Sequence, residues 1–188
     1  MQESDHYLKR RDAIALLRDS GCSESVIEHS LAVSKLAKKI ANKIKKNGYD
    51  IDVEFVEIAS ILHDIGRCKT HGIRHGIEGA RILRSLKLDR FARVCEVHIG
   101  AGLTKEEAIS LGLPAKSYLP RTIEEKVVAH ADNLISHNKI VSIQETLGKL
   151  EKELGKNHPA IKRVEKLNNF IENLCKNKNK KERGDLNG

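Results

Sequence analysis

The sequence predicts an all-α fold, and two observations carry this prediction. Hydrophobic residues make up 39% of the 188 residues and charged residues 32%, but the chain has only three Phe, three Tyr and no Trp. The core must therefore be built from Leu, Ile, Val and Ala, which suits packed helices better than a sheet. Apolar residues also recur at helical spacing along almost the whole chain, with no alternating segment of useful strand length. We expect one domain over residues 1–175.

The helix boundaries follow from apolar spacing and from capping signals. Thr104 with Glu107, and Thr122 with Glu125, have the spacing of a capping box at a helix start. Pro159 stands where a first helical residue is tolerated. A short helix is expected after Thr104, and the other expected helices cover about residues 5–20, 23–47, 52–65, 76–86, 89–99, 122–138, 141–155 and 159–175.

The charge balance favours anionic partners. Lys and Arg number 34 against 26 Asp and Glu, which gives a formal net charge of +8, and a basic protein attracts nucleotides, nucleic acids or phosphorylated metabolites. Part of this excess lies in residues 176–188, which are expected to form a disordered, solvated tail. A nucleic-acid-binding arm is the alternative there, although no aromatic residue is interleaved to stack on bases.

Cysteine spacing and hydropathy predict the cellular setting. None of the four cysteines forms a CxxC pair, so a thiolate zinc site is not expected. The N-terminus does not resemble a signal peptide, and the longest apolar runs are far short of a membrane span. We therefore expect a cytoplasmic protein with no membrane partner.

Four polar residues fall where apolar residues are expected. His29 shares a helix face with apolar residues, His63 and Asp64 end the apolar segment VEIASILHDIG, and Asp132 lies in line with Val128. One inward His is more often a core residue than a ligand. Two imidazoles and two carboxylates on three inward faces are costly to bury unless a common partner satisfies them. A divalent cation would do so, and nitrogen with carboxylate ligands suits Fe, Mn or Zn, as well as Mg.

The order of these residues resembles the H…HD…D signature of the HD superfamily of metal-dependent phosphohydrolases. HDIG at 63–66 is similar to the motif of its HDIG subgroup, which includes small archaeal and bacterial proteins. The segments VIEHSLAVSKLAKKIA, IASILHDIGR and EEKVVAHADNL resemble the family's metal-binding helices over about residues 10–140. The resemblance implies an HD-domain helical bundle with a central metal site.

In this resemblance, His29, His63, Asp64 and Asp132 hold one divalent metal. The implied reaction is hydrolysis of a phosphate ester or anhydride by a metal-activated water, with Asp64 in a catalytic role. The expected substrate is a nucleotide or a related small phosphorylated molecule. A phosphomonoester and a phosphodiester remain equally open.

Three further residues could act at this site. His75 and His98 stand where several HD subgroups have additional histidines, which either ligate a second metal, contact the phosphate or protonate the leaving group. His75 is therefore a catalytic candidate, His98 a substrate-binding candidate, and both are candidate second-metal ligands. Ile99 follows His98 where many dinuclear members have a second His. Arg67 could bind a phosphate through two hydrogen bonds, or be an exposed charge past a helix end.

Several alternatives stay open at this point. A minority of HD proteins are diiron oxygenases on the same scaffold, and a non-catalytic module that binds nucleotides or nucleic acid would keep the same fold. The Gly- and Pro-containing segment of about residues 98–122 could be a loop over the pocket or a plain connection. The remaining histidines are assigned no role: His6, His71, His130, His137 and His158.

Overall fold

The computed structural model describes residues 8–176. Residues 5–7 of the first expected helix, and all but the first residue of the expected 176–188 tail, lie outside this range. Every expected helix is found within it, which confirms the all-α prediction. The helices are α1 (Arg10–Asp19), α2 (Glu24–Lys46), α3 (Val53–Leu62), the 3-10 helix η2 (Ile65–Cys68), α4 (His75–Ser85), α5 (Asp89–Val97), α6 (Lys105–Ser110), α7 (Ile123–Asn133), α8 (Ile143–Leu154) and α9 (Pro159–Cys175).

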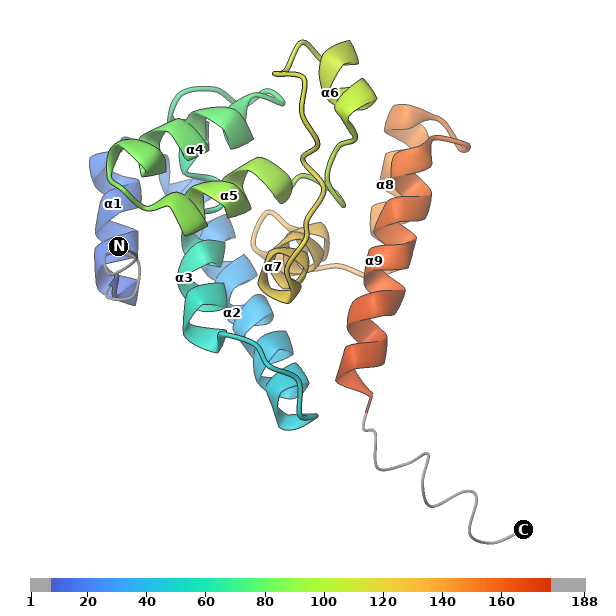
Figure 1. Ribbon diagram of the computed structural model, residues 1–188, viewed down its shortest axis with the longest axis horizontal. Coiled ribbons are helices and arrows are strands. Elements are labelled where there is room, and N and C mark those ends of the chain that lie inside the picture. Colours follow the sequence, from blue (N-terminus) through green and yellow to red (C-terminus); the bar gives the residue numbers. More distant parts are fainter. Residues whose placement is uncertain (1–7, 177–188) are drawn as a thin grey trace, which may run out of the picture.

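The helices pack around α2, α3 and α7 (Figure 1). The long helix α2 lies against both α3 and α7, and α1 covers another side of α3. Helices α4 and α5 form one pair at the top left of Figure 1, and α8 and α9 form another at its right side. Two helix pairs and α1 therefore flank the three central helices.

The core is aliphatic, as the composition predicts. Leu17, Ile44, Ile61 and Val128 are completely buried in one cluster that reaches from α1 to α7. Burial of such side chains contributes about 1.5–3 kcal/mol each. This cluster surrounds the polar residues described below and provides most of the packing that holds them in place.

The helix expected over residues 52–65 ends earlier than predicted. Helix α3 stops at Leu62, and the chain then tightens through His63 and Asp64 into η2. The physical reason lies at Gly66, whose backbone is in direct contact with the start of α4. A straight continuation of α3 could not make this contact, and the bend points Asp64 away from the helix axis.

The helix expected over residues 122–138 also ends early, at Asn133. It is followed by a hairpin of β1 (Ile135–Ser136) and β2 (Lys139–Ile140). The hydroxyl of Thr146 donates to the Asn133 carbonyl at 2.5 Å, and His137 adopts a left-handed φ of 59° in the turn. Each strand has only two residues, too short to produce an alternating pattern, so the hairpin agrees with the expectation of no strand of useful length.

Both predicted capping boxes are confirmed. Thr104 with Glu107 begins α6, and Thr122 with Glu125 begins α7, with the side chain and backbone bonds of the motif present in each. Ser142 with Glu145 forms a third capping box at the start of α8, which the sequence analysis missed. Each cap satisfies backbone N–H groups that the helix itself cannot pair.

Residues 99–121 form a connection packed on the side of α4 and α5. Tyr118 and Leu113 bury their side chains in a small second hydrophobic cluster with Ile77. Lys116 forms an ion pair of 2.8 Å with the buried Glu96 of α5. No residue of this segment lines the pocket over the site described below, which favours the plain connection of the two expectations.

Candidate metal centre

The fold brings together all six residues proposed from the sequence as metal ligands. They come from five separate parts of the structure, and their ligand atoms meet near the middle of the bundle. His29 lies on α2, His63 and Asp64 in the turn after α3, His75 at the start of α4, His98 just past α5, and Asp132 near the end of α7.

The first group of ligand atoms gathers around Asp132. Its Oδ1 lies 2.9 Å from Nε2 of His29 and 3.4 Å from Nε2 of His63. Oδ2 of Asp64 lies 3.9 Å and 3.8 Å from the same two nitrogens. The ligand atoms of His29, His63 and Asp132 are all within 4.8 Å of one another, close enough to share one ion.

The second group gathers around the other oxygen of Asp64. Oδ1 lies 3.2 Å from Nε2 of His75 and 3.5 Å from Nε2 of His98, and these two nitrogens are 3.1 Å apart. Burial lowers the pKa of His98 below its ordinary value. Two neutral rings at this distance would turn lone pairs toward each other, so a proton or a cation between them stabilises the contact.

The four imidazoles share one orientation. In each ring Nδ1 lies 2.7–2.8 Å from a backbone carbonyl oxygen, so Nδ1–H donates and Nε2 points to the centre. The carbonyl belongs to His137 for His29, Ser60 for His63, Gly72 for His75 and Cys95 for His98. Such bonds to the outer nitrogen typically fix the tautomer of a metal-binding His.

Two buried atoms of the centre accept or donate no hydrogen bond. These are Nε2 of His63 and Oδ1 of Asp64, on side chains that are almost completely buried. An unpaired buried polar atom costs free energy, and an unpaired carboxylate oxygen costs more than a neutral one. A cation in contact with both atoms would satisfy them. Neutral imidazole nitrogens with carboxylate oxygens suit a divalent transition metal, so the residues present fit such an ion.

The charges of the centre favour a bound cation. Burial alone would raise the pKa of Asp64, but the charge of His63 and the other nearby imidazoles lower it well below its usual range. Burial would likewise raise the pKa of Asp132, but His29 and His63 lower it far below its ordinary value. Burial lowers the pKa of His63, yet the two carboxylates raise it to about 9. The two carboxylates therefore stabilise the protonated form of His63, and a bound divalent cation would have to displace this proton.

A close backbone contact sets the position of His75. A Cβ built on Gly66 would lie 1.9 Å from the carbonyl oxygen of His75 and 2.4 Å from the amide nitrogen of Gly79. Only glycine permits this approach of η2 to α4. The glycine of the HDIG motif therefore allows α4 to begin where the His75 imidazole reaches Asp64.

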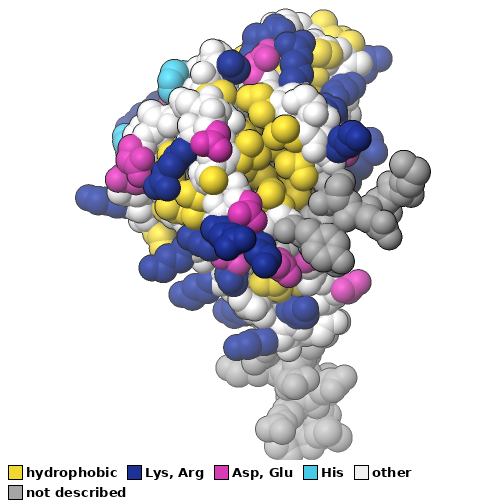
Figure 2. Space-filling view, turned by 90° about the vertical axis from the view of Figure 1, so that its left-hand side faces the viewer, with side chains coloured by type: hydrophobic (Ala, Val, Ile, Leu, Met, Phe, Trp, Pro, Cys, Tyr) yellow, Lys and Arg dark blue, Asp and Glu magenta, His cyan; other side chains and the backbone are white. Residues whose placement is uncertain are grey.

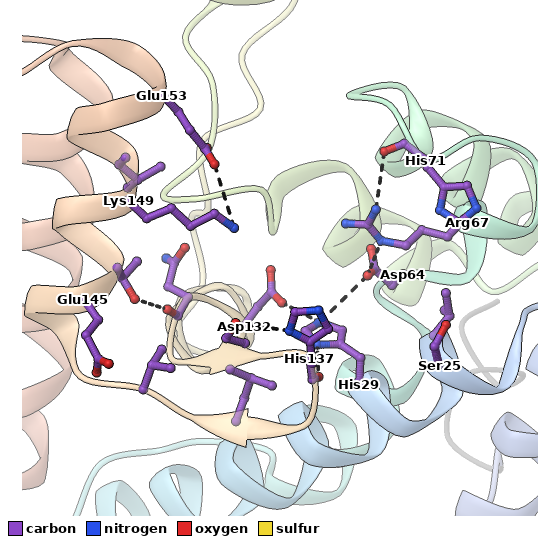
Figure 3. Close-up of a pocket in the computed structure, with 17 residues that line it drawn as sticks. Ser25, His29, Asp64, Arg67, His71, Asp132, His137, Glu145, Lys149 and Glu153 are labelled. Atoms are coloured by element: carbon purple, nitrogen blue, oxygen red, sulfur yellow. Dashed lines mark hydrogen bonds and ion pairs between the residues drawn. The ribbon is translucent and has the colours of Figure 1, made fainter.

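A pocket of about 780 Å³ opens over the centre (Figure 3). Asp64, Asp132 and His29 line its base, and Figure 3 shows Arg67 on one side and Lys149 of α8 on the other. The pocket is much larger than a single phosphoryl group. Its far wall is α8, from which Glu145, Thr146, Lys149, Leu150 and Glu153 reach the pocket.

Arg67 and His71 line the pocket, whereas His130 does not. Arg67 lines the pocket, and its Nε forms an ion pair with Oδ2 of Asp64. His71, to which no role was assigned, also lines the pocket and accepts a 3.4 Å hydrogen bond from Arg67 through its carbonyl oxygen. His130 is buried away from the pocket lining, and burial lowers its pKa to about 4.

The wall formed by α8 was not predicted from the sequence. Lys149 and Glu153 are both more than half exposed and lie 3.9 Å apart at i,i+4 spacing. In the sequence this pair is indistinguishable from an ordinary solvated helix face. Only the packing of α8 against α9 and the hairpin after α7 places it beside the metal centre.

No helix within residues 8–176 combines the length and apolar character needed to cross a bilayer.

Relatives among known proteins share most of this chain. An uncharacterized protein of Methanocaldococcus jannaschii is 58% identical over 165 residues, which cover 87% of this chain and 97% of that protein. The tRNA (cytidine(56)-2'-O)-methyltransferase of Picrophilus torridus is 42% identical over 172 residues, which cover 90% of this chain and 48% of the methyltransferase. The corresponding enzyme of Thermoplasma volcanium is 41% identical, with coverages of 83% and 44%. The chain thus spans about half the length of these two methyltransferases.

A solved structure and a family model identify the fold and the family. The HD domain of the phosphodiesterase PgpH of L. monocytogenes matches with a TM-score of 0.51 at 17% identity, over 86% of this chain and 96% of that one, which shows a shared fold. The family model described as HD domain matches residues 26–136, a range that contains the six residues of the candidate centre. This range is more than half of the sequence, and the chain belongs to the HD domain family.

Proposed function

We propose that the chain is a phosphohydrolase that uses two divalent cations to cleave a phosphodiester. The observation that carries this proposal is the position of Asp64 between two sets of imidazoles. Oδ2 faces His29 and His63, whereas Oδ1 faces His75 and His98. One carboxylate shared by two ligand groups suits a pair of cations acting on a single phosphoryl group.

The chemistry divides between the metals and the chain. Bound divalent cations lower the pKa of a coordinated water and polarise a phosphoryl oxygen. Asp64 and Asp132 provide the negative charge that holds them, and the backbone carbonyls keep each imidazole aimed at the centre. Arg67, whose Nε pairs with Asp64, offers its terminal N–H donors at the edge of the pocket for a phosphate oxygen. His75 serves as a ligand of the second cation rather than as a proton donor, because its Nε2 faces Asp64 and His98.

Replacing either His75 or His98 with Ala is expected to lower the bound metal from two ions to one per chain. Each change removes a ligand of the second group and leaves His29 and its partners intact. Turnover of a phosphodiester should fall at least about 100-fold, since one cation then does the work of two. Elemental analysis of the purified variants measures the metal. His158→Asn, which changes a helix cap away from the centre, should keep both ions, and a His98→Ala protein with two ions would contradict the assignment.

The pocket favours a substrate that continues on both sides of the reacting phosphate. Arg67 and Lys149 lie on opposite sides of the metal-binding residues (Figure 3). Two cationic side chains so placed suit a substrate with anionic groups on either side, such as an oligonucleotide, better than a phosphomonoester. The positions of Arg67 and Lys149 therefore favour a phosphodiester substrate over a phosphomonoester.

Replacing Lys149 with Ala is expected to lower kcat/KM for a short oligonucleotide about tenfold, because one anionic contact outside the reacting group is lost. Hydrolysis of bis(p-nitrophenyl) phosphate, which has no second phosphate, should change less than about twofold. Lys152→Ala is the matched control, since Lys152 lies on α8 but does not line the pocket. Equal losses on both substrates would show that Lys149 acts on the centre itself and not on the extended substrate.

The proposed function is tested by metal analysis combined with activity screening. The purified protein, loaded separately with manganese, iron, zinc or magnesium, is assayed on monoesters, diesters and short oligonucleotides. Metal-dependent hydrolysis of a phosphodiester to a phosphomonoester and an alcohol is the expected result. Oxygen consumption by the iron-loaded protein without any hydrolysis would support the oxygenase alternative. Metal binding with no turnover of any phosphate would indicate a non-catalytic module.

A second candidate is that the phosphodiester belongs to RNA. Two relatives at 41–42% identity are tRNA methyltransferases, and this chain matches about half of each. When such a domain is joined to a tRNA-modifying enzyme, the RNA bound by that enzyme lies close to the domain and is a candidate phosphodiester substrate for it. The test compares cleavage of matched oligoribonucleotides and oligodeoxyribonucleotides. Faster cleavage of the ribonucleotide is expected, and equal rates would count against an RNA substrate.

A further inference from the structure

A second groove runs along the outer face of α2, with Arg10 of α1 and Glu57 of α3 beside it, and it shares no lining residue with the metal pocket. Its volume is about 930 Å³. The inward face of α2 is made of fully buried residues such as Val33, Ala37 and Ile44, so the groove lies on the opposite side of that helix. Six cationic side chains line it against a single acidic one, Glu57; the six are Arg10, Lys35, Lys38, Lys39, Lys43 and Lys46.

The positive charge of this groove is largely uncompensated. Glu57 forms ion pairs with both Arg10, at 3.0 Å, and Lys38, at 2.5 Å, so its one negative charge is already shared. Across residues 8–176, no ion pair or side-chain hydrogen bond is found for the other four lysines of the groove. The groove therefore carries an excess of positive charge that the described part of the chain does not neutralise.

The spacing of these lysines makes the excess costly for the helix. Lys35, Lys39 and Lys43 follow one another at i,i+4 and rise about 6 Å at each step. Like charges at this spacing destabilise a helix. The dipole of α2 favours cations in its last turn, which accounts for Lys43 and Lys46 but not for Lys35 and Lys39. A polyanion lying along the helix would remove this repulsion.

We propose that this groove binds the sugar-phosphate backbone of RNA, at a site separate from the metal centre. A row of lysines along a concave surface matches a rod-like polyanion and releases its counterions. An anionic membrane fits less well, because a membrane-binding helix presents apolar side chains to the lipid. Here the apolar lining residues Leu31 and Ala32 are partly buried and pack against the core. Figure 2 shows Lys and Arg side chains over much of the molecule's α1 side, including its lower half, where Figure 1 places the α2 C-terminus.

The inference goes beyond the proposed hydrolase, and its test does not depend on catalysis. The probe is a fluorescently labelled, unmodified tRNA transcript, titrated with the full chain by anisotropy between about 50 and 300 mM KCl, salt values chosen to resolve the slope. The test variant is Lys39→Glu with Lys43→Glu. Affinity is expected to fall at least about tenfold, and the slope of log K against log salt to become shallower by about 1.5, as two phosphate contacts are lost. Metal content and hydrolysis of bis(p-nitrophenyl) phosphate should stay unchanged.

Two controls separate groove binding from general attraction. Lys45→Glu with Lys166→Glu changes the net charge by the same amount at exposed positions outside the groove and should weaken binding less than about threefold. Lys39→Gln with Lys43→Gln gives a milder loss in the same direction and guards against misfolding by charge reversal, which thermal melting of each variant also monitors.

The outcomes are distinguishable from those of the proposed function. RNA binding that survives Asp64→Ala and depends on the groove supports the inference even if no phosphodiester is hydrolysed. Equal loss in the groove and control pairs, or loss of binding with Asp64→Ala alone, overturns it. Groove-dependent binding to phosphatidylserine vesicles with unchanged RNA affinity would also overturn it and would assign the groove to a membrane surface.

Discussion

Replacing Asp64 with Asn is expected to empty both cation sites and to reduce phosphodiester turnover at least about a thousandfold. The substitution keeps the volume of the side chain but removes the negative charge. Among residues 8–176, Asp64 is the carboxylate whose two oxygens face both groups of imidazoles, at 3.2–3.9 Å. Loss of His75 or His98 removes a ligand of one group, whereas this change removes a charged ligand from both. Its effect should therefore exceed that of any single His replacement.

Elemental analysis and a hydrolysis assay of the Asp64→Asn protein measure this expectation. Glu125→Gln is the matched control, because Glu125 is also a buried carboxylate but caps α7, a role that Gln can fill. Circular dichroism shows whether each variant keeps its helices. A folded Asp64→Asn protein that retains both ions and full turnover would disprove the central assignment.

Replacing Gly66 with Ala is expected to destabilise the protein by about 3 kcal/mol and to weaken binding at the second cation site. The added Cβ would overlap backbone atoms of His75 and Gly79, at 1.9 and 2.4 Å. No flexible side chain can move aside, so η2 and α4 must separate. The His75 imidazole, now 3.2 Å from Asp64, would move with α4.

Chemical denaturation gives the free energy of unfolding, and metal titration gives the affinity of each site. Gly148→Ala is the control, since nothing lies within 4 Å of a Cβ built there. Gly148 lies inside α8, where Ala should stabilise the helix by up to about 1 kcal/mol. Equal stability of the Gly66→Ala protein and the unchanged chain would show that the contact between η2 and α4 is not tight.

The helices were predictable because apolar periodicity and capping residues determine them locally. Four residues of the centre, His29, His63, Asp64 and Asp132, were predictable because they are polar residues in apolar segments. The apolar face that contains His29 and Val33 follows the period of a helix, and α2 forms as expected. Thr104 and Thr122 begin helices because their hydroxyls accept bonds from backbone N–H groups three residues later. Asp64 and Asp132 lie in apolar segments of the sequence, where burying a carboxylate costs free energy. This cost predicted that one cation binds both.

The tertiary structure alone decided how these residues meet. The sequence left open whether His75 and His98 share a site with Asp64, because that depends on the angle between α4 and η2, set by the contact at Gly66. The helix expected to run to residue 138 gives way to a hairpin whose His137 carbonyl orients His29. Lys149 reaches the pocket only because α8 packs back over the centre. These three features of the site depend on contacts between segments far apart in the chain. The apolar period of each helix and its capping box depend only on residues within about one helical turn.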